Sequence, residues 1–326
     1  MNREIDQKSR RDQIKKGPRA GRIALLVLLL VAATFLGHLR FDLPVETLAR
    51  EYAGETSSFI DIDGLDVHYC EEGAGEPLVL IHGWAASLHT WDSWAEILKE
   101  DFRIIRMDLP GFGLTGPAES ADYSLDFYVD FLDRFLTALG VEESHIAGNS
   151  LGGGITWLYA ASHPEKVKKA ILIDAAGYKM ESTPSITRLA GPKAVQSMLR
   201  YVTPRYAVGF LVKQVYGDKE KVTGDTVRRY YRLLLREGNR EVLFKVLDKT
   251  HKLGDKEVRE LLNGIEAPAL IMWGEQDAWI PPELAYRFEQ DIPGARLITY
   301  EGAGHIPMEE IPEITARDAK SFLLGE

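Results

Sequence analysis

Cysteine is almost absent from this chain of 326 residues, because Cys70 is its single example. An internal disulfide is therefore excluded, and so is a zinc site built on several cysteines. Cys70 lies in the strand-like run LDVHYC, where we expect a small buried side chain rather than a chemical role. The sequence also lacks an apolar run of typical transmembrane length. The run at 23–37 has fifteen residues, against about 20 in a typical spanning helix.

Positive charge is scarce outside the first forty residues. Residues 1–40 contain nine Lys and Arg and three Asp and Glu, a net charge of +6. The remaining residues contain 30 basic and 46 acidic side chains, a net charge of −16. An acidic body of this kind argues against a nucleic-acid partner.

The basic N-terminus and the apolar run behind it form a pattern of their own. Eight Lys and Arg precede the run, and a positive flank predicts that this side stays in the cytoplasm. We therefore predict a basic cytoplasmic tail at 1–22 and a single membrane anchor at 23–39. The rest of the chain is then extracytoplasmic, in the periplasm if the source is bacterial. The alternative is a cleaved signal peptide and a secreted protein, but no A-x-A cleavage site follows the run directly.

Beyond a linker, strand-like and helical patterns alternate. Repeated pairs of a strand and a helix imply the α/β class, with a mostly parallel sheet and helices on both faces. Residues 180–264 interrupt the alternation with helix-forming sequence alone, which we interpret as a helical cap inserted after the sixth strand. The core then comprises residues 57–179 and 265–326. The expected strands are 59–62, 65–70, 77–81, 102–107, 145–147, 170–173, 269–273 and 296–300.

The stretch GNSLGG, residues 148–153, stands between an expected strand and an expected helix. A serine in that position lies on a sharp turn that exposes its hydroxyl at the carboxyl edge of the sheet. Gly148 permits the tight turn, and Gly152 permits the helix to start close to the strand. Ser150 is therefore the candidate nucleophile, and open α/β sheets bind their ligands at this edge.

A serine hydroxyl needs a base, and the base needs an acid that fixes its tautomer. His305 follows the last expected strand and is the candidate base. Asp277 follows the strand 269–273 and is the candidate acid, whereas Asp174, at the end of the strand 170–173, is the alternative acid. The order Ser, Asp, His is the one found with a nucleophile elbow.

The negative charge of a tetrahedral intermediate needs two backbone N–H donors. Leu151, directly after the nucleophile, is expected to supply one. Trp84 in the loop HGWAAS is the candidate for the other, with Ala85 next. His82 in the same loop is expected to brace the loop rather than to transfer protons.

Five motifs occur in a fixed order: HGWAAS, DLPGFG, GNSLGG, GEQDAWIP and GAGHIP. On these motifs residues 57–326 resemble the α/β-hydrolase superfamily, and within it the capped serine esterases and lipases. The N-terminal segment and the cap together are similar to membrane-anchored monoacylglycerol lipases. The resemblance implies a serine hydrolase that cleaves small hydrophobic or lipid-like carboxylic esters through an acyl-enzyme. It implies a membrane as partner and neither a cofactor nor a metal.

Three alternatives stay open. Hydrolases that cleave carbon–carbon bonds of ring-cleavage products share a G-N-S-x-G-G elbow, so Asn149 fits them, but HGWAAS replaces their H-G-x-G-P-G-A loop. A cofactor-free perhydrolase is the second alternative. A non-catalytic binding protein is the third, and the complete set of three candidate catalytic residues argues against it. A nucleotide partner is not expected, because Pro117 rather than a helix follows the G-x-G-x-x-G stretch at 111–116.

The cap contributes apolar side chains for which the sequence allows several positions. They either pack the cap onto the core, which we expect, or line an acyl pocket, or face a bilayer. The side chains in question are Tyr206, Val208, Phe210, Leu211, Val212 and Val215.

Overall fold

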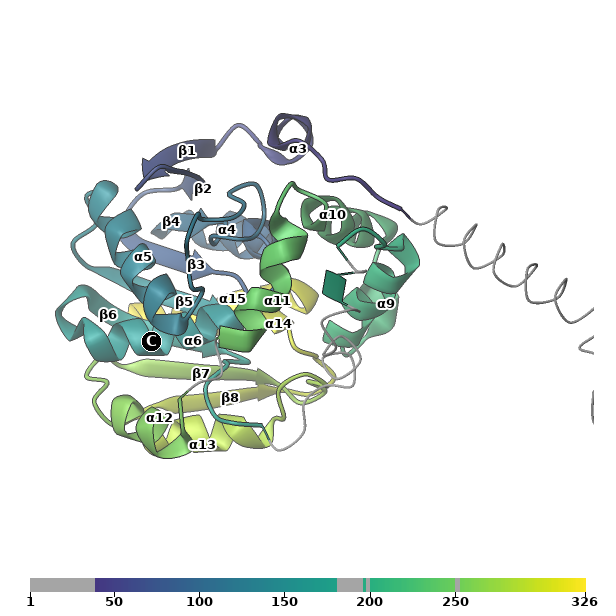
Figure 1. The fold of residues 1–326 in the computed structure, drawn as a ribbon. Helices are drawn as coiled ribbons and strands as arrows, with labels where there is room; N and C mark the ends of the chain where they lie inside the picture. The colour runs from purple at the N-terminus through teal and green to yellow at the C-terminus, as the bar shows by residue number, and fades with distance from the viewer. Residues whose placement is uncertain (1–38, 181–195, 198–199, 250–252) are drawn as a thin grey trace, which may run out of the picture.

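Eight strands form one sheet in the order β1-β2-β4-β3-β5-β6-β7-β8 (Figure 1). The computed structural model describes residues 39–180, 196–197, 200–249 and 253–326. The pairs β1–β2 and β2–β4 are antiparallel, and every other pair is parallel. The expected α/β class with a mostly parallel sheet is confirmed. The strands are β1 (Ser57–Ile62), β2 (Leu65–Glu72), β3 (Glu76–Ile81), β4 (Phe102–Met107), β5 (Ser144–Asn149), β6 (Val167–Ile173), β7 (Ala269–Gly274) and β8 (Arg296–Tyr300).

Helices cover both faces of the sheet, and the strands alternate between two apolar cores as a result. In β3, Val79 and Ile81 belong to the core that contains helices α5 and α6, whereas Leu78 and Leu80 belong to the core on α4 and α15. Successive side chains of a strand point to opposite faces, so a strand buried on both faces is apolar throughout. The helices of the sheet faces are α4 (Asp92–Leu98), α5 (Leu125–Ala138), α6 (Leu151–Ser162), α13 (Glu283–Asp291) and α15 (Pro312–Leu324).

The antiparallel hairpin at one edge has a tight two-residue turn. Asp63 and Gly64 join β1 to β2, and their φ angles are 54° and 83°. Two positive φ values suit the turns that match the twist of paired strands, which is why Asp-Gly is favoured there. Ile62 pairs with Leu65 directly across the turn.

Between β6 and β7, the regular elements within the described residues are helices, and α9, α10 and α11 lie over the carboxyl edge of the sheet (Figure 1). Helices α9 and α10 pack on each other, whereas α12 packs against α6 and α13 of the core. The helices of this connection are α9 (Arg205–Val215), α10 (Gly224–Leu234), α11 (Asn239–Lys249) and α12 (Asp255–Leu262). The connection also contains the short η3 (Lys219–Lys221) between α9 and α10. The short elements elsewhere are α3 (Val45–Tyr52), α14 (Pro307–Glu310), η1 (Leu88–Trp91) and η2 (Pro164–Lys166).

The N-terminal predictions fall almost wholly beyond the described residues. The predicted tail 1–22 and the predicted anchor 23–39, except for Leu39, lie outside them. In the part of the chain that the structure describes, no helix is both long enough and apolar enough to cross a membrane. Leu39 itself forms an antiparallel bridge with Val202, just before α9.

Candidate active site

The backbone at Ser150 is strained, because this residue adopts a positive φ although it is not glycine. Ser150 lies between β5 and α6 with φ 54° and ψ −115°. This conformation is uncommon for L-residues and persists only where its surroundings hold it. The Ser150 N–H donates to the Ile173 carbonyl of β6 at 2.9 Å, and this bond holds the turn against the neighbouring strand.

Two glycines make room for this turn. A Cβ on Gly148 would lie 2.1 Å from the Gly152 carbonyl oxygen, and a Cβ on Gly152 would lie 2.1 Å from the Ile81 carbonyl oxygen. Both distances are far shorter than a van der Waals contact and involve backbone, which cannot rotate away. The helix after Ser150 therefore starts directly against β3 and β5 only because both positions lack a side chain.

His305 and Asp277 form a buried hydrogen-bonded pair. Nδ1 of His305 lies 2.7 Å from Oδ2 of Asp277, and both residues are buried. The other carboxylate oxygen of Asp277 accepts from the N–H groups of Trp279 at 2.7 Å and Ile280 at 3.0 Å. An acid at Nδ1 fixes the tautomer in which Nε2 is the acceptor, as a general base requires.

His305 lies in the loop between β8 and α14, residues 301–306, which we call the histidine loop. Asn149 joins this loop to the turn that carries Ser150. Its Nδ2 donates to the His305 carbonyl at 2.9 Å and to the Ile173 carbonyl at 3.2 Å. The residue directly before Ser150 is thus bonded to the backbone of the candidate base. The structure brings Ser150, Asp277 and His305 to one edge of the sheet.

Asp174 lies in the same site but in a different position. Its Oδ1 accepts from the Gly274 N–H at 3.0 Å, and its side chain is completely buried. Burial and the neighbouring Asp277 carboxylate raise the pKa of Asp174 well above its usual value. The imidazole Nδ1 is bonded to Asp277, so the alternative acid does not hold the acid position in this structure.

These three side chains also form the one set of potential metal ligands found among the described residues. One ligand atom of each of Asp174, Asp277 and His305 lies within 4.8 Å of the others. Nδ1 of His305 and Oδ2 of Asp277 are already at hydrogen-bond distance. A cation would have to replace that hydrogen bond, so the arrangement suits proton transfer better than metal binding.

The loop after β3 packs against the serine turn. A Cβ on Gly83 would lie 3.0 Å from the Ser150 Cβ, and Ala85 in the same loop has a positive φ of 59°.

His82 braces this loop through both of its ring nitrogens. Nε2 of His82 accepts from the Leu109 N–H at 3.0 Å, so Nδ1 carries the proton and donates to the Gly83 carbonyl at 2.7 Å. Burial lowers the pKa of His82, and the neutral ring braces this loop. Of the two expected donors to an oxyanion, Trp84 belongs to this loop, whereas Leu151 is the first residue of α6 and directly follows Ser150.

Two tryptophans connect this loop to the histidine. Trp279 stacks on His305, with ring centroids 6.0 Å apart and an interplanar angle of 16°. Trp84 packs on Trp279 at 6.0 Å, and its indole N–H donates to the Leu243 carbonyl of α11 at 2.8 Å. The sequence analysis did not single out Trp279. Its position two residues after the candidate acid Asp277 could have indicated an aromatic residue close to the site.

Glu310 is a second residue that the sequence analysis missed. Its buried carboxylate accepts from the N–H groups of Gly217 at 3.0 Å, Asp218 at 2.7 Å and Gly304 at 2.8 Å. The His305 N–H donates to the Val215 carbonyl at 2.8 Å, at the end of α9. Glu310 and this bond fasten the histidine loop to the end of α9, and nothing in the pattern of α14 indicated it.

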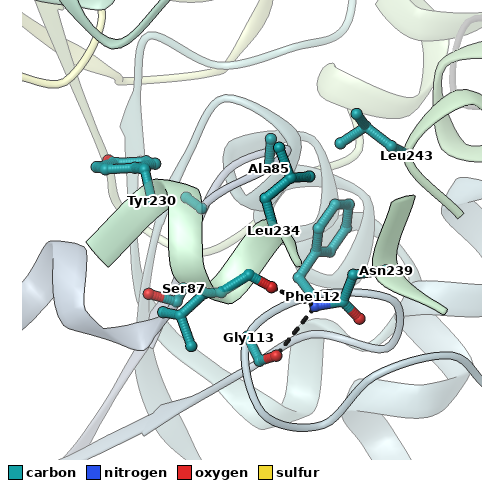
Figure 2. Close-up of a pocket in the computed structure, with 10 residues that line it drawn as sticks. Ala85, Ser87, Phe112, Gly113, Tyr230, Leu234, Asn239 and Leu243 are labelled. Atoms are coloured by element: carbon teal, nitrogen blue, oxygen red, sulfur yellow. Dashed lines mark hydrogen bonds between the residues drawn. The ribbon is translucent and has the colours of Figure 1, made fainter. Parts of the chain in front are cut away.

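A pocket opens beside the loop after β3, between the DLPGFG loop and helices α10 and α11 (Figure 2). None of its lining residues is charged. Asn239 is held in its wall, because Nδ2 donates to the Gly113 carbonyl at 3.0 Å and to the Leu233 carbonyl at 2.9 Å. The lining residues are Ala85, Ala86, Ser87, Phe112, Gly113, Tyr230, Leu233, Leu234, Asn239 and Leu243.

The apolar residues of α9 do not line this pocket. Val208 and Val212 are buried, as expected for packing onto the molecule, whereas Tyr206 and Phe210 are exposed. The expectation that these side chains pack the cap onto the core is therefore correct for one face of α9 and wrong for the other.

Comparison with known proteins agrees with this geometry. The sequence profile described as the alpha/beta hydrolase fold matches residues 76–312. Lipase 1 of Psychrobacter immobilis is 31% identical over 279 residues, which cover 82% of this chain and 84% of the lipase. A 2-hydroxy-6-oxononadienedioate/2-hydroxy-6-oxononatrienedioate hydrolase of Paraburkholderia phymatum is 31% identical over 264 residues, which cover 77% of this chain and 89% of that enzyme.

A solved structure is similar over nearly the whole chain. The crystal structure of a bacterial membrane phospholipase A superposes with a TM-score of 0.72 and 27% sequence identity. The match covers 94% of this chain and 98% of the phospholipase. The similarity therefore extends beyond the sheet and its flanking helices.

Proposed function

The chain belongs to the α/β-hydrolase family, and on that premise we propose that it is a serine hydrolase that cleaves carboxylic esters of hydrophobic acyl groups, lipid-like esters included. Its relatives include lipases and hydrolases of dienoic acids, so hydrolysis is common to them. The ester bond and the serine nucleophile are the finer parts of the proposal.

The proposed reaction uses Ser150, His305 and Asp277 in the usual roles of a triad. Nε2 of His305 takes the proton of the Ser150 hydroxyl while Oγ attacks the ester carbonyl. The N–H groups of Leu151 and Trp84 stabilise the negative oxygen of the tetrahedral intermediate. The intermediate collapses to an acyl-serine, and His305 returns its proton to the departing alcohol. Water then repeats the cycle, releases the acid and restores the serine.

The observation that carries the proposal is the buried pair of Asp277 and His305 at the sheet edge where the strained turn exposes Ser150. The pocket beside the loop after β3 indicates the kind of group that this side of the site tolerates, because none of its lining residues is charged (Figure 2). The dienoic acids and dienedioates named for the carbon–carbon hydrolases carry carboxylates. A carboxylate in an apolar pocket without a cationic partner is unfavourable. The pocket therefore favours esters over ring-cleavage products, although Asn149 and the relatives keep the latter as the second candidate.

We also propose that the N-terminal segment anchors the chain to a membrane, with the catalytic part on the far side from the basic tail. The support is the apolar run at 23–37 behind eight Lys and Arg. The similarity to a membrane phospholipase A adds to it, because that match includes 94% of this chain. An anchor would hold the active site close to lipid esters.

The decisive test compares p-nitrophenyl esters from acetate to dodecanoate as substrates of the wild type and Ser150→Ala. We expect the wild type to turn over and the variant to lose activity by a factor on the order of 10⁶. Ser162→Ala, an exposed serine at the other end of α6, is the matched control and should match the wild type. Hydrolysis of a ring-cleavage diketone without turnover of any ester would overturn the proposal in favour of the second candidate.

A further inference from the structure

Helix α9 shows two opposite faces. Tyr206 and Phe210, four residues apart on one face, are 70% and 61% exposed. Val208 and Val212, also four residues apart, are buried on the other. Residues at this spacing lie above one another on a helix, so the outer face of α9 presents an aromatic stripe to its surroundings.

Two more exposed aromatic residues lie near the start of α9, one in the segment before α3 and one just before α9 itself. Phe41 is 86% exposed and Tyr201 is 57% exposed. The Arg40 N–H donates to the Tyr201 carbonyl at 2.8 Å, so the two stretches of chain run side by side. We name Phe41, Tyr201, Tyr206 and Phe210 the aromatic face. They are four of the eight large apolar side chains that are exposed among the described residues, and such clustering marks an interaction surface.

A buried arginine fixes the point at which the N-terminal segment meets this face. Arg240 of α11 donates to the Arg40 carbonyl at 2.8 Å, to Thr203 Oγ1 at 3.1 Å and to Asp42 Oδ1 at 3.1 Å. The apolar run at 23–37 ends only two residues before Leu39. Leu39, the first described residue after this run, bridges Val202, and the N-terminal end of the coloured ribbon lies next to α9 and α10 (Figure 1).

The charges around the face suit an anionic surface. Helix α9 contains no acidic residue, and Arg205 and Lys213 on it are exposed, as is Arg40. The chain beyond residue 40 carries 30 basic and 46 acidic side chains, a net charge of −16, so most of its surface would be repelled by anionic lipid. A second copy of the chain would bring like charges together at this face, which disfavours it as the occupant.

We propose that the aromatic face docks on the lipid bilayer, with Tyr206 and Phe210 at the boundary between headgroups and acyl chains. Aromatic side chains flanked by Lys and Arg favour that boundary. The inference rests on the proposed membrane anchor, which would hold this side of the molecule at the bilayer. Because the Val215 carbonyl at the end of the same helix bonds the His305 N–H, the docked helix would also be in contact with the candidate base.

The test places a fluorescent probe on the face in the full chain. Cys70 is buried and 3% exposed, so a new cysteine at Phe210→Cys can be labelled selectively with an environment-sensitive dye. The matched control is Leu324→Cys, an exposed apolar position next to the C-terminus, which lies on the far side of the core from α9 (Figure 1). Both proteins are reconstituted into vesicles of phosphatidylcholine and phosphatidylglycerol, with or without a lipid that carries a nitroxide near the top of its acyl chain.

We expect a blue shift and strong nitroxide quenching at position 210, and neither at position 324. Equal quenching at the two positions, or none at 210 in a chain that floats with the vesicles, overturns the docking. A blue shift at 210 without quenching overturns it as well, because protein rather than lipid then covers the face. A chain that does not float contradicts both the anchor and the docking, and turnover of a soluble ester by the same sample shows whether the proposed hydrolysis survives.

Discussion

Two buried carboxylates lie beside one imidazole, and their surroundings assign them different tasks. Asp277 accepts from His305 through one carboxylate oxygen and from two backbone N–H groups through the other, so both of its oxygens are engaged. Asp174 accepts one backbone N–H and faces the Asp277 carboxylate, so its neutral form is favoured. A charged acid orients a histidine and stabilises its imidazolium, which a neutral acid cannot do.

This difference predicts opposite outcomes for two matched variants. Asp277→Asn should lower kcat by about 10⁴-fold, because an amide stabilises the wrong tautomer of His305. Asp174→Asn replaces a neutral carboxyl group with a neutral amide and should leave kcat within a few fold of the wild type. Steady-state hydrolysis of a p-nitrophenyl ester checks both. A severe loss in Asp174→Asn together with an active Asp277→Asn would exchange the two roles.

At the scale of single residues, the sequence predicts those candidate catalytic residues that follow a strand of the sheet. Ser150, Asp277 and His305 each follow an expected strand, so the parallel sheet brings them to one edge. Trp279 and Glu310 could not be predicted in the same way. Trp279 acts through its contact with His305, and Glu310 acts through its hydrogen bond with Gly217. The sequence shows a tryptophan in a loop and a glutamate in a short helix, but it does not show which residues they contact.

At the scale of elements, the end of α9 and the histidine loop behave as one unit. Glu310 accepts three N–H groups that come from both of them. Leaving a buried backbone donor without an acceptor costs about 1–3 kcal/mol. The position of His305 therefore depends on a carboxylate that takes no part in the proposed reaction.

Glu310→Gln should weaken this junction, because an amide offers one acceptor oxygen where the carboxylate has two. We expect the free energy of unfolding to fall by about 1–3 kcal/mol and kcat/KM to fall by up to about 10²-fold as His305 shifts. Urea titration and ester hydrolysis measure the two effects. Glu313→Gln, an exposed glutamate on α15, is the control and should change neither. Wild-type activity in Glu310→Gln would show that the loop is held without it.

The positions of the strands along the chain were predictable, because a strand buried on both faces is apolar throughout and differs from the sequence around it. β3, β7 and β8 begin or end within one residue of their expected bounds, since glycine, proline and charged residues flank them. The place of α12 was not predictable. Its sequence is amphipathic like that of α10, and only the neighbouring surface of α6 and α13 decides that it packs on the core.

At the scale of the whole molecule, the same buried aspartate makes stability depend on pH. The pKa of Asp174 is raised in the folded chain, above about 3.9 in the unfolded chain. Between those two pKa values the folded state binds the extra proton, so stability is lost as the pH rises. Asp108 has the opposite effect. Burial alone would raise its pKa, but the hydrogen bond and charge of His68 outweigh burial and lower it to about 2.

Asp174→Asn should remove the loss of stability that the Asp174 carboxyl group causes as the pH rises. The free energy of unfolding of the variant, minus that of the wild type, is expected to increase from pH 4 to pH 7, by up to about 1.4 kcal/mol per pH unit. Urea titrations at both pH values measure it. Asp108→Asn provides the contrast, because its destabilisation should be present at pH 7 and shrink as the pH falls towards 2. A difference for Asp174→Asn that does not vary with pH would mean that Asp174 is ionised in the folded protein.

The close approach of Gly217 to the histidine loop has a consequence for recombination between relatives. A Cβ on Gly217 would lie 2.1 Å from the Gly302 carbonyl oxygen, and a Cβ on Gly304 would lie 2.4 Å from the Gly217 nitrogen. Helices from another hydrolase could not be grafted between β6 and β7 by themselves, since a side chain at either position would displace the candidate base. A working chimera would have to inherit the end of α9 and the segment from Gly302 to Glu310 from the same parent, so these two stretches form one unit of exchange although they are far apart in the sequence.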